Sequence, residues 1–550
     1  MLGLFIGSDA AAQAFDRPAD ERPELPAFES APPEGPILAP PPQVVSPGAP
    51  AGPRFLVRGF RVHGATVFSD EELAEILDPY NGREISSEEL ADIRAALTRL
   101  YVDHGYVNSG ALVRDQDLTD GIVDIQIVEG RLGAIRVSGQ RRFRESRLRD
   151  RIAVGLKPPL DLRKLENNLQ LLQQDPRIER LHARLLPSER LGEATLLVRV
   201  EERRPYRLDI EASNYAPVAF GGVRGQFRLA HENVLGFGDT LASRFLVAEG
   251  LLRVDGRYEY PLNARGTLLQ LRGEYSNSRI VEEPFDILDI ETDYYAARIG
   301  VTHPFYRSPR TQILAGLLLE WRRADTCFGA LEDLIGCDPF DFVESGSIAG
   351  ESTVSVARFN LEWERLERNQ VFAARSLLSA GIPVLGARSS GVFPDGVFVA
   401  WLGQFQWARR FEPWGIQTIL RTDVQLTSDA LPTLEQIPVG GHASVRGYRE
   451  NQVVRDQAVI TSLELRLPVW RAEGRSIVEL APFFDFGYAF NRNRATPEPD
   501  TLASAGIGLR LFPHRSVEAQ LYWGYQIDEV ATSGNLQDDG VQFRVRWKPF

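Results

Sequence analysis

The stretch Gly440-Gly-His-Ala-Ser-Val-Arg-Gly-Tyr448 lies in a loop-like segment, residues 427–457, between two strand patterns that alternate apolar with polar residues. The Gly440-Gly441 pair frees the backbone, and Gly447 permits a tight turn behind Arg446. Long loops in compact proteins are usually functional or disordered. If this loop folds back onto the protein, Arg446 needs an anionic partner.

The best candidate for that partner is Asp485, in the sequence Phe483-Phe-Asp-Phe-Gly487. The other residues of this expected strand are almost all apolar, so its single carboxylate stands out. Residue chemistry alone leaves two alternatives open. Arg446 either pairs with Asp485, or it is a solvated arginine on an exposed loop.

The two motifs resemble the signature pair of outer-membrane two-partner secretion transporters of the haemolysin activator type (ShlB/FhaC/HecB family), within the superfamily that assembles outer-membrane barrels. The residues that carry the resemblance are Val445, Arg446, Gly447 and Tyr448 in the loop and Phe483, Phe484, Asp485 and Gly487 in the strand. The resemblance implies that the loop folds into a barrel lumen and that Arg446 pairs with Asp485 on the inner wall.

Composition limits the class of protein. The chain has 550 residues, 43% of them hydrophobic, and no run approaches the eighteen apolar residues of a transmembrane helix. Barrel strands remain compatible with this composition, because they expose only alternate residues to lipid. The formal net charge of -13 argues against general nucleic-acid binding, which needs a basic surface.

The chain has two cysteines, Cys327 and Cys337, in one Gly- and Asp-rich segment. Two cysteines are too few for a structural zinc site. In an oxidising compartment they would close a small loop as a disulfide. We predict this disulfide for an exported protein; the alternative is two unpaired thiols.

The N-terminal region contains no pattern of a folded domain. Residues 1–14 are typical of the end of a secretory signal, and Ala12-Gln-Ala14 fits a small-x-small cleavage site. Residues 15–53 carry many prolines and few large apolar side chains, which predicts a disordered or extended linker.

Residues 54–130 and 131–203 each have a strand-helix-helix-strand-strand pattern, which predicts two copies of one small domain. Ser69 with Glu72 forms a capping box ahead of the first helix. Both segments resemble the polypeptide-transport-associated (POTRA) domains of the same transporters. A three-stranded sheet of this kind leaves an edge strand to which an extended peptide can add. The alternative is a spacer with protected edges.

From residue 204 to 550 the helical period gives way to alternation, as in Leu252–Tyr260, where Arg253 and Asp255 oppose Leu252 and Val254. A charged face of this density indicates a wet lumen inside an apolar exterior. The alternating runs predict an antiparallel barrel of about sixteen strands. Short turns belong on the periplasmic side and long loops outside. This parity places Cys327 and Cys337 in an extracellular loop. It also makes the segment 427–457 start outside, so the segment would have to fold inward to reach Asp485.

The predicted fold is therefore a pair of α+β periplasmic POTRA domains followed by an all-β, 16-stranded transmembrane barrel. The resemblance implies a location in the outer membrane of a Gram-negative bacterium. It also implies export of one large, unfolded exoprotein that bears an N-terminal two-partner secretion domain. An outer-membrane protein or lipid insertase of the same superfamily is the alternative. A passive solute porin would explain the barrel but not residues 54–203.

The sequence offers no catalytic constellation. It contains no His-x-x-x-His pair, no Gly-x-Ser-x-Gly elbow and no Walker-type phosphate loop. We therefore predict no enzyme activity, no catalytic residue, no metal site and no cofactor; a barrel lipase or protease is the minor alternative. Expected partners besides the exoprotein are outer-membrane lipids and, during biogenesis, the barrel assembly machinery. We expect no nucleic-acid partner and a monomer.

Overall fold

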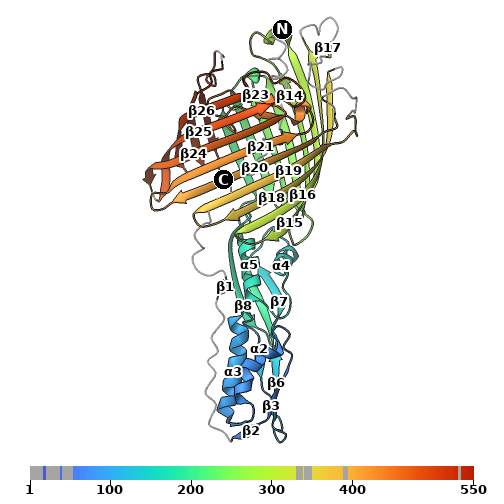
Figure 1. The fold of residues 1–550 in the computed structure, drawn as a ribbon, viewed down its shortest axis with the longest axis vertical. Helices are drawn as coiled ribbons and strands as arrows, with labels where there is room; N and C mark the ends of the chain where they lie inside the picture. Colours follow the sequence, from blue (N-terminus) through green and yellow to red (C-terminus); the bar gives the residue numbers. More distant parts are fainter. Residues whose placement is uncertain are drawn as a thin grey trace. The chain divides into compact units, whose positions relative to one another are not determined.

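A computed structural model describes most of the chain (Figure 1). The described residues are 17–19, 38–39, 54–329, 338–339, 350–387, 394, 396–472, 474–530 and 534–549. The chain divides into two compact units. The N-terminal unit is Ala31–Arg203, and the barrel unit is Arg204–Phe550 together with Met1–Ser30.

The first domain of the N-terminal unit has the expected element order. Its elements are β2 (Phe55–Val57), β3 (Gly59–His63), α2 (Asp70–Leu77), η2 (Asp78–Tyr80), β4 (Arg83–Ile85), α3 (Ser87–Asp103), β5 (Gly110–Leu112) and β6 (Ile122–Val128). Strand β6 is central, parallel to β3 and antiparallel to β5. Strand β5 is only three residues long.

Both helices of this domain begin at a capping box, and the sequence predicted the first of the two. The Ser69 hydroxyl accepts a hydrogen bond from the Glu72 amide, and the Glu72 carboxylate accepts one from the Ser69 amide at 2.9 Å. Ser86 and Glu89 make the same reciprocal pair ahead of α3. Each box satisfies two amides that the first helical turn leaves without an intrahelical partner.

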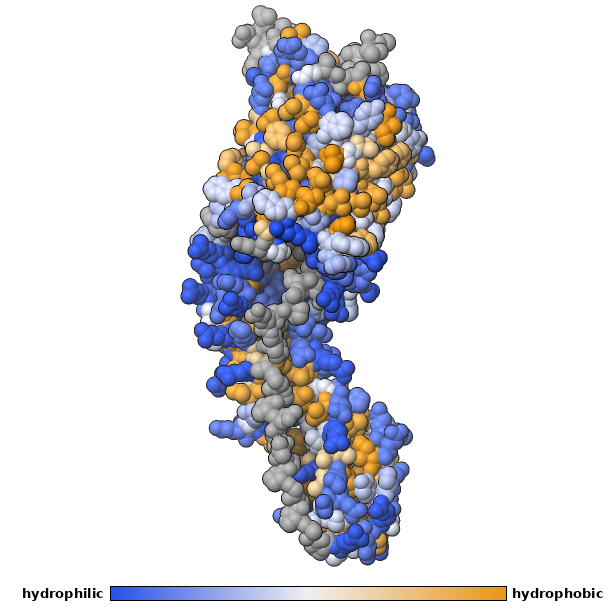
Figure 2. All heavy atoms as spheres, turned by 90° about the vertical axis from the view of Figure 1, so that its left-hand side faces the viewer, coloured by the Kyte–Doolittle hydropathy of each residue, from blue (hydrophilic) through white to orange (hydrophobic). Residues whose placement is uncertain are grey.

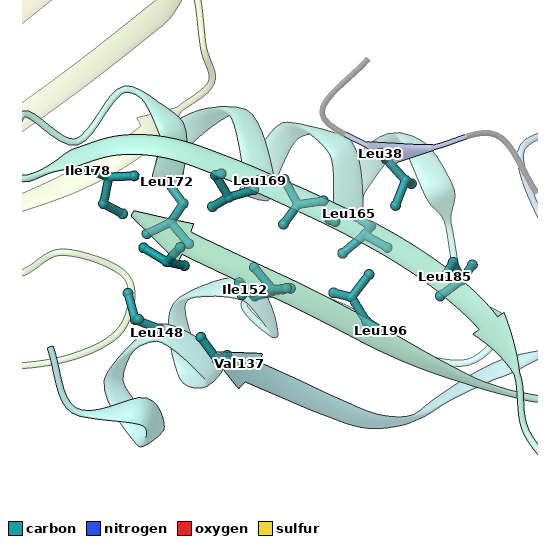
Figure 3. Packing of buried hydrophobic residues seen from close by; sticks show 14 of the residues in the cluster. Leu38, Val137, Leu148, Ile152, Leu165, Leu169, Leu172, Ile178, Leu185 and Leu196 are labelled. Atoms are coloured by element: carbon teal, nitrogen blue, oxygen red, sulfur yellow. The ribbon is translucent and has the colours of Figure 1, made fainter. Parts of the chain in front are cut away.

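The second domain has the expected strand-helix-helix-strand-strand order, and its described residues include no counterpart of β2 and β4. Its elements are β7 (Arg131–Ser138), α4 (Glu145–Ile152), α5 (Leu162–Gln173), β8 (Ile178–Pro187) and β9 (Glu193–Glu202). Strand β9 is central, parallel to β7 and antiparallel to β8. The apolar faces of α4 and α5 pack on the sheet and bury Leu165, Leu169 and Leu196 completely (Figure 3).

The outer edge of β8 is occupied, whereas β7 ends the described sheet on its other side. Residues Leu38–Ala39 form the short strand β1, which pairs in parallel with β8 and places Leu38 opposite Ala183. The Leu38 side chain is buried in the core of the second domain (Figure 3). Residues 15–53 were predicted to be a disordered or extended linker. At Leu38–Ala39 the segment is extended and paired, and no pattern in the sequence indicates this pairing because one leucine can complete an existing apolar core.

The barrel unit is a closed antiparallel barrel. Within the described residues its strands are β10 (Tyr206–Ser213), β11 (Arg224–Glu232), β12 (Thr240–Ala248), β13 (Leu251–Pro261), β14 (Leu268–Arg279), β15 (Ile290–Arg307), β16 (Thr311–Phe328), β18 (Glu351–Leu366), β19 (Gln370–Gly381), β20 (Val399–Phe411), β21 (Ile416–Thr427), β24 (Gln457–Ala472), β25 (Arg475–Phe490), β26 (Thr501–His514), β27 (Val517–Gln526) and β28 (Val541–Trp547). These are sixteen long strands, as predicted, and β10 pairs with β28 to close the ring. A two-residue strand, β17 (Asp338–Pro339), pairs with the end of β16.

The pleat sorts the barrel side chains as the alternation predicted. On β13, Leu252 is exposed on the outer face, whereas Arg253 and Asp255 are buried on the inner face. Hydrophobic side chains gather in a band on the barrel surface in view, with hydrophilic residues on either side of it (Figure 2). No helix among the described residues is long and apolar enough to cross a membrane.

The second domain depends on a buried ion cluster at Asp175. Its carboxylate accepts hydrogen bonds from Arg151 at 2.6 Å and from Arg177 at 2.7 Å. Removing one partner of a buried ion pair costs about 3–5 kcal/mol. We expect Asp175→Asn to lower the free energy of unfolding of this domain by a comparable amount, measured by limited proteolysis of the full chain in increasing urea. Asp150→Asn, at an exposed carboxylate on α4, is the control, and equal shifts in both variants would contradict the prediction.

The same cluster predicts a pH dependence. Desolvation alone would raise the pKa of Asp175, but the charges of Arg151 and Arg177 outweigh it and hold this pKa below its usual range. The folded domain therefore binds fewer protons than the unfolded chain near the ordinary carboxyl pKa. Its stability should be complete above about pH 5 and should fall as the pH drops below about 4. In Asp175→Asn this part of the acid sensitivity should be absent.

Candidate functional site

The segment 427–457, which we call the lumen loop, folds back into the barrel as a hairpin. It contains η5 (Thr433–Glu435), β22 (Ile437–Val439) and β23 (Val453–Arg455), and β22 pairs with β23 in antiparallel register. Apolar side chains of both strands and of the tip are fully or almost fully buried against inward-facing residues of the wall. The barrel thus contains an ordered loop that packs on its inner wall.

Arg446, at the tip of this loop, binds Asp485 on β25. Its guanidinium donates to both carboxylate oxygens, from Nε at 2.8 Å and from Nη2 at 2.9 Å. The Arg446 backbone amide donates a third bond at 3.0 Å. Asp485 is fully buried, with 0% of its surface exposed, so this bidentate contact fixes both the side chain and the backbone of the tip.

A second carboxylate, Glu464 on β24, also binds Arg446 through Nη1. Glu464 is shared with Arg466, whose Nε donates to it at 2.6 Å. The Arg446 guanidinium lies over the rings of Phe483 at 3.9 Å and Tyr522 at 5.0 Å. The arginine is therefore enclosed by two carboxylates and two aromatic faces, which together replace its hydration shell.

Glycines let the loop tip approach the wall. Gly447 adopts φ +92°, and a Cβ at this position would lie 2.9 Å from the carbonyl oxygen of Gly524 on β27. Gly487 leaves room for Val445, because a Cβ there would lie 2.9 Å from the Val445 side chain. At Gly447 the backbone of the tip contacts the backbone of the wall. At Gly487 the Val445 side chain contacts the backbone of the wall.

The residues after Arg446 add further contacts. The Tyr448 hydroxyl lies 2.9 Å from the carbonyl oxygens of Ala503 and Asp528 and can donate to either. Arg449 donates to Asp538 at 2.8 Å and to Glu282 at 2.7 Å, and both carboxylates lie in other loops of the barrel. Each residue from Val445 to Arg449 therefore has its own contact on the wall or on neighbouring loops.

The described residues 17–19 also lie against the inner wall. The carbonyl oxygen of Pro18 accepts from Arg375 at 3.4 Å, and that of Ala19 accepts from Gln404 at 3.3 Å. Arg17 is fully buried and donates to the Thr433 carbonyl of the lumen loop at 3.4 Å. Our prediction of a linker beginning at residue 15 did not anticipate these contacts inside the barrel.

Not every predicted site residue lies at this contact. Phe484 points outward and is 47% exposed, because it alternates with the inward-facing Phe483 and Asp485. Cys327 lies at the end of β16 and is disulfide-bonded. Its predicted partner, Cys337, lies outside the described residues.

Sequence reasoning missed Glu464, Tyr522 and Gly524. The alternation already placed Glu464 on the charged face of its strand, opposite Leu463 and Leu465, so the lumen side was predictable. Its pairing with Arg446 was not predictable, because it depends on how β24 and β25 align. Tyr522 and Gly524 carried no signal that distinguished them from other inward-facing residues.

Two family models match the chain. The model described as "POTRA domain, ShlB-type" matches residues 55–130. The model described as "Haemolysin secretion/activation protein ShlB/FhaC/HecB" matches residues 346–511. The second range contains both Arg446 and Asp485.

The chain is similar to the outer membrane transporter CdiB of Dickeya dadantii, with 21% identity over 504 residues, 89% of this chain and 85% of that protein. It is 24% identical to the hemolysin transporter protein ShlB of Serratia marcescens over 432 residues, 74% of this chain and 71% of that one. A structure of CdiB from Escherichia coli matches with a TM-score of 0.67 and 19% identity, covering 94% of each chain. At this identity the structural match shows the fold alone.

The fold and the family models define an outer-membrane β-barrel transporter with N-terminal POTRA domains. More specifically, the match to the ShlB/FhaC/HecB model and the similarity to CdiB and ShlB confirm the resemblance to two-partner secretion transporters that the sequence motifs carry.

The backbone contact at Gly447 makes a testable prediction. An alanine there would clash with the Gly524 backbone and adopt an unfavourable φ, so Gly447→Ala should displace the loop tip. We expect trypsin to cleave the folded variant in detergent after Arg446 or Arg449 about tenfold faster than the parent protein, as for a local opening made easier by about 1.4 kcal/mol. Mass spectrometry of the fragments identifies the cleavage position.

Gly474→Ala is the matched control. Gly474 also has a positive φ, of +73°, but a Cβ there would meet nothing within 4 Å. The Gly474→Ala variant therefore has a similar backbone strain to Gly447→Ala but no clash with the barrel wall. Equal cleavage of the two variants within residues 441–455 would contradict the proposed role of the close approach.

Proposed function

We propose that this protein recognises one unfolded exoprotein in the periplasm and exports it through its barrel to the cell surface. The observation that carries the proposal is the lumen loop. A sixteen-strand barrel encloses an aqueous channel unless something fills it. Here an ordered loop fills part of the lumen, and a buried ion cluster at Arg446 holds it on the wall.

This arrangement favours a gated transporter over a passive porin. The contacts of Arg446 are polar and specific in geometry, so the loop has one defined position in the resting state. Buried ion pairs add little net stability, because desolvation offsets most of the attraction. A loop held in this way is positioned without being fixed irreversibly, as a channel for a passing chain requires.

The POTRA domains supply the binding step of the proposal. An extended chain can add to a sheet edge through backbone hydrogen bonds, with little demand on its own sequence. This mode suits a cargo that arrives unfolded and carries an N-terminal secretion domain. Folding of the cargo outside the cell would supply free energy by preventing its return. We expect no enzymatic step in this cycle.

An outer-membrane insertase of the same superfamily is the alternative function. The two functions differ in what is lost when the gene is deleted. Loss of one large protein from the medium or the cell surface, with outer-membrane barrels unchanged, would support the secretion function. A broad decrease of barrels without one missing exoprotein would instead support the insertase.

Arg446→Ala tests the role of the ion cluster. The variant leaves the carboxylates of Asp485 and Glu464 buried without the arginine, so the loop tip should leave the wall while the ring of sixteen strands persists. We expect a barrel that still migrates as a folded, heat-modifiable species and a decrease of about tenfold or more in the secreted partner. Quantitative immunoblotting of cells and medium measures both.

Asp485→Ala and the variant that combines Arg446→Ala with Asp485→Ala complete a double-mutant cycle. If the two residues act as a unit, the double variant should secrete about as poorly as either single variant. Arg365→Ala, at an exposed arginine paired with Glu367 on the barrel, is the control and should secrete normally. Normal secretion by Arg446→Ala would show that the ion cluster has no role in transport.

A further inference from the structure

The lumen loop carries a second buried carboxylate, Glu435, in η5. Glu435 is 3% exposed and binds Arg358 on β18 in a bidentate manner, at 2.6 and 2.9 Å. Arg322 on β16 lies 3.4 Å from the same carboxylate and donates to the adjacent carbonyl of Leu434 at 2.8 Å. No part of the sequence reasoning singled out this contact.

Glu435 balances charge on the wall. Glu320 on β16 binds three arginines, Arg298 at 2.7 Å, Arg322 at 3.0 Å and Arg358 at 2.9 Å. These four groups alone sum to three positive charges and one negative charge. The carboxylate of Glu435 reduces this excess, so a residue of the loop completes the electrostatics of the wall.

This contact lies on a different part of the wall from the contact of Arg446. Glu435 binds β16 and β18, whereas Arg446 binds β24 and β25, and strands β19, β20 and β21 separate β18 from β24 in the barrel. The two loop residues are eleven positions apart in the sequence. The loop is therefore attached at two separated sectors of one ring.

The root of the loop is fixed separately. Asp456 is fully buried and accepts from the Leu431 amide at 3.1 Å, from Gln436 at 2.9 Å and from Arg494 at 2.7 Å. These bonds join the two ends of the hairpin to each other and to the loop that follows β25. They do not involve β16 or β18, to which Glu435 binds through its carboxylate and Leu434 through its carbonyl oxygen.

We propose that Glu435 is a positioning residue that acts as a second latch of the lumen loop. In the resting state it closes the sector of the lumen beside β16 and β18, while Arg446 closes the sector beside β24 and β25. The channel opens fully only when both ion clusters release the loop. This latch rests on the proposed transport function for its purpose, but it exists in the empty barrel without cargo.

The test compares the purified full-length protein with its Glu435→Gln variant in planar lipid bilayers, without any cargo. Glutamine keeps the shape of the side chain and removes its charge. We expect the fraction of time in conducting states to rise about tenfold, equivalent to about 1.4 kcal/mol. Trypsin cleavage after Arg446 and Arg449 should stay at the parent level, because the tip remains bound to Asp485.

Arg358→Gln should produce a similar increase, and the double variant should exceed neither single variant. Glu479→Gln is the matched control, since Glu479 is a buried wall carboxylate that binds Arg510 at 3.0 Å. It should leave the conducting fraction unchanged. A Glu435→Gln channel that behaves like the parent or like the control would overturn the latch.

The latch and the transport function fail in different experiments. Altered conductance with no exoprotein dependent on the gene would keep the latch and reject the secretion function. Normal secretion by the parent, with unaltered conductance in Glu435→Gln, would keep the secretion function and reject the latch. Combining Glu435→Gln with Arg446→Ala should increase the conducting fraction more than either change alone, because the two contacts hold different sectors.

Discussion

The position of the lumen loop inside the barrel depends on burying the Arg446 guanidinium against the wall. An unpaired buried charge is too costly to persist, so the wall must present carboxylates where the loop tip arrives. Asp485 and Glu464 do so from adjacent strands, and both are almost completely buried. The rings of Phe483 and Tyr522 cover the remaining faces of the cation. The burial of Arg446 therefore constrains three things together: the position of the loop, the alignment of β24 with β25, and the charge of the wall.

The same need for charge balance holds around the whole barrel, because the pleat directs the charged side chains of the strands into the lumen. The outer face must be apolar to meet lipid, so charged side chains of the strands face inward, and many of them pair with a cross-strand neighbour. Arg298 with Glu320 and Arg510 with Glu479 are examples. The lumen loop meets such charged groups in two sectors of the wall, where Arg446 and Glu435 supply charges of opposite sign.

Much of the fold was predictable because strands and helix starts are marked by patterns that span only a few residues of the sequence. Alternation fixed the inward side of Arg253, and the Ser69 capping box fixed the start of α2. Residue chemistry left the pairing of Arg446 with Asp485 as one of two alternatives, and the family resemblance implied it. The contacts of Glu435 and Leu38 were not predicted. Each is a single buried residue in a loop-like segment, so no repeating pattern marks it, and its partners lie far away in the sequence.

The division of labour inside the lumen loop follows from the different physics of its contacts. Ile437, Val439 and Val445 bury apolar surface, which is favourable for each and indifferent to orientation. In the ion clusters the cost of desolvation nearly cancels the electrostatic attraction. Removing one partner is nevertheless strongly destabilising, because the other charge stays buried. Apolar burial therefore retains the hairpin in the lumen, whereas the charges select one position for it. A loop built this way can move between wall contacts only by exchanging one set of counter-charges for another, and a polar chain in transit could offer such groups.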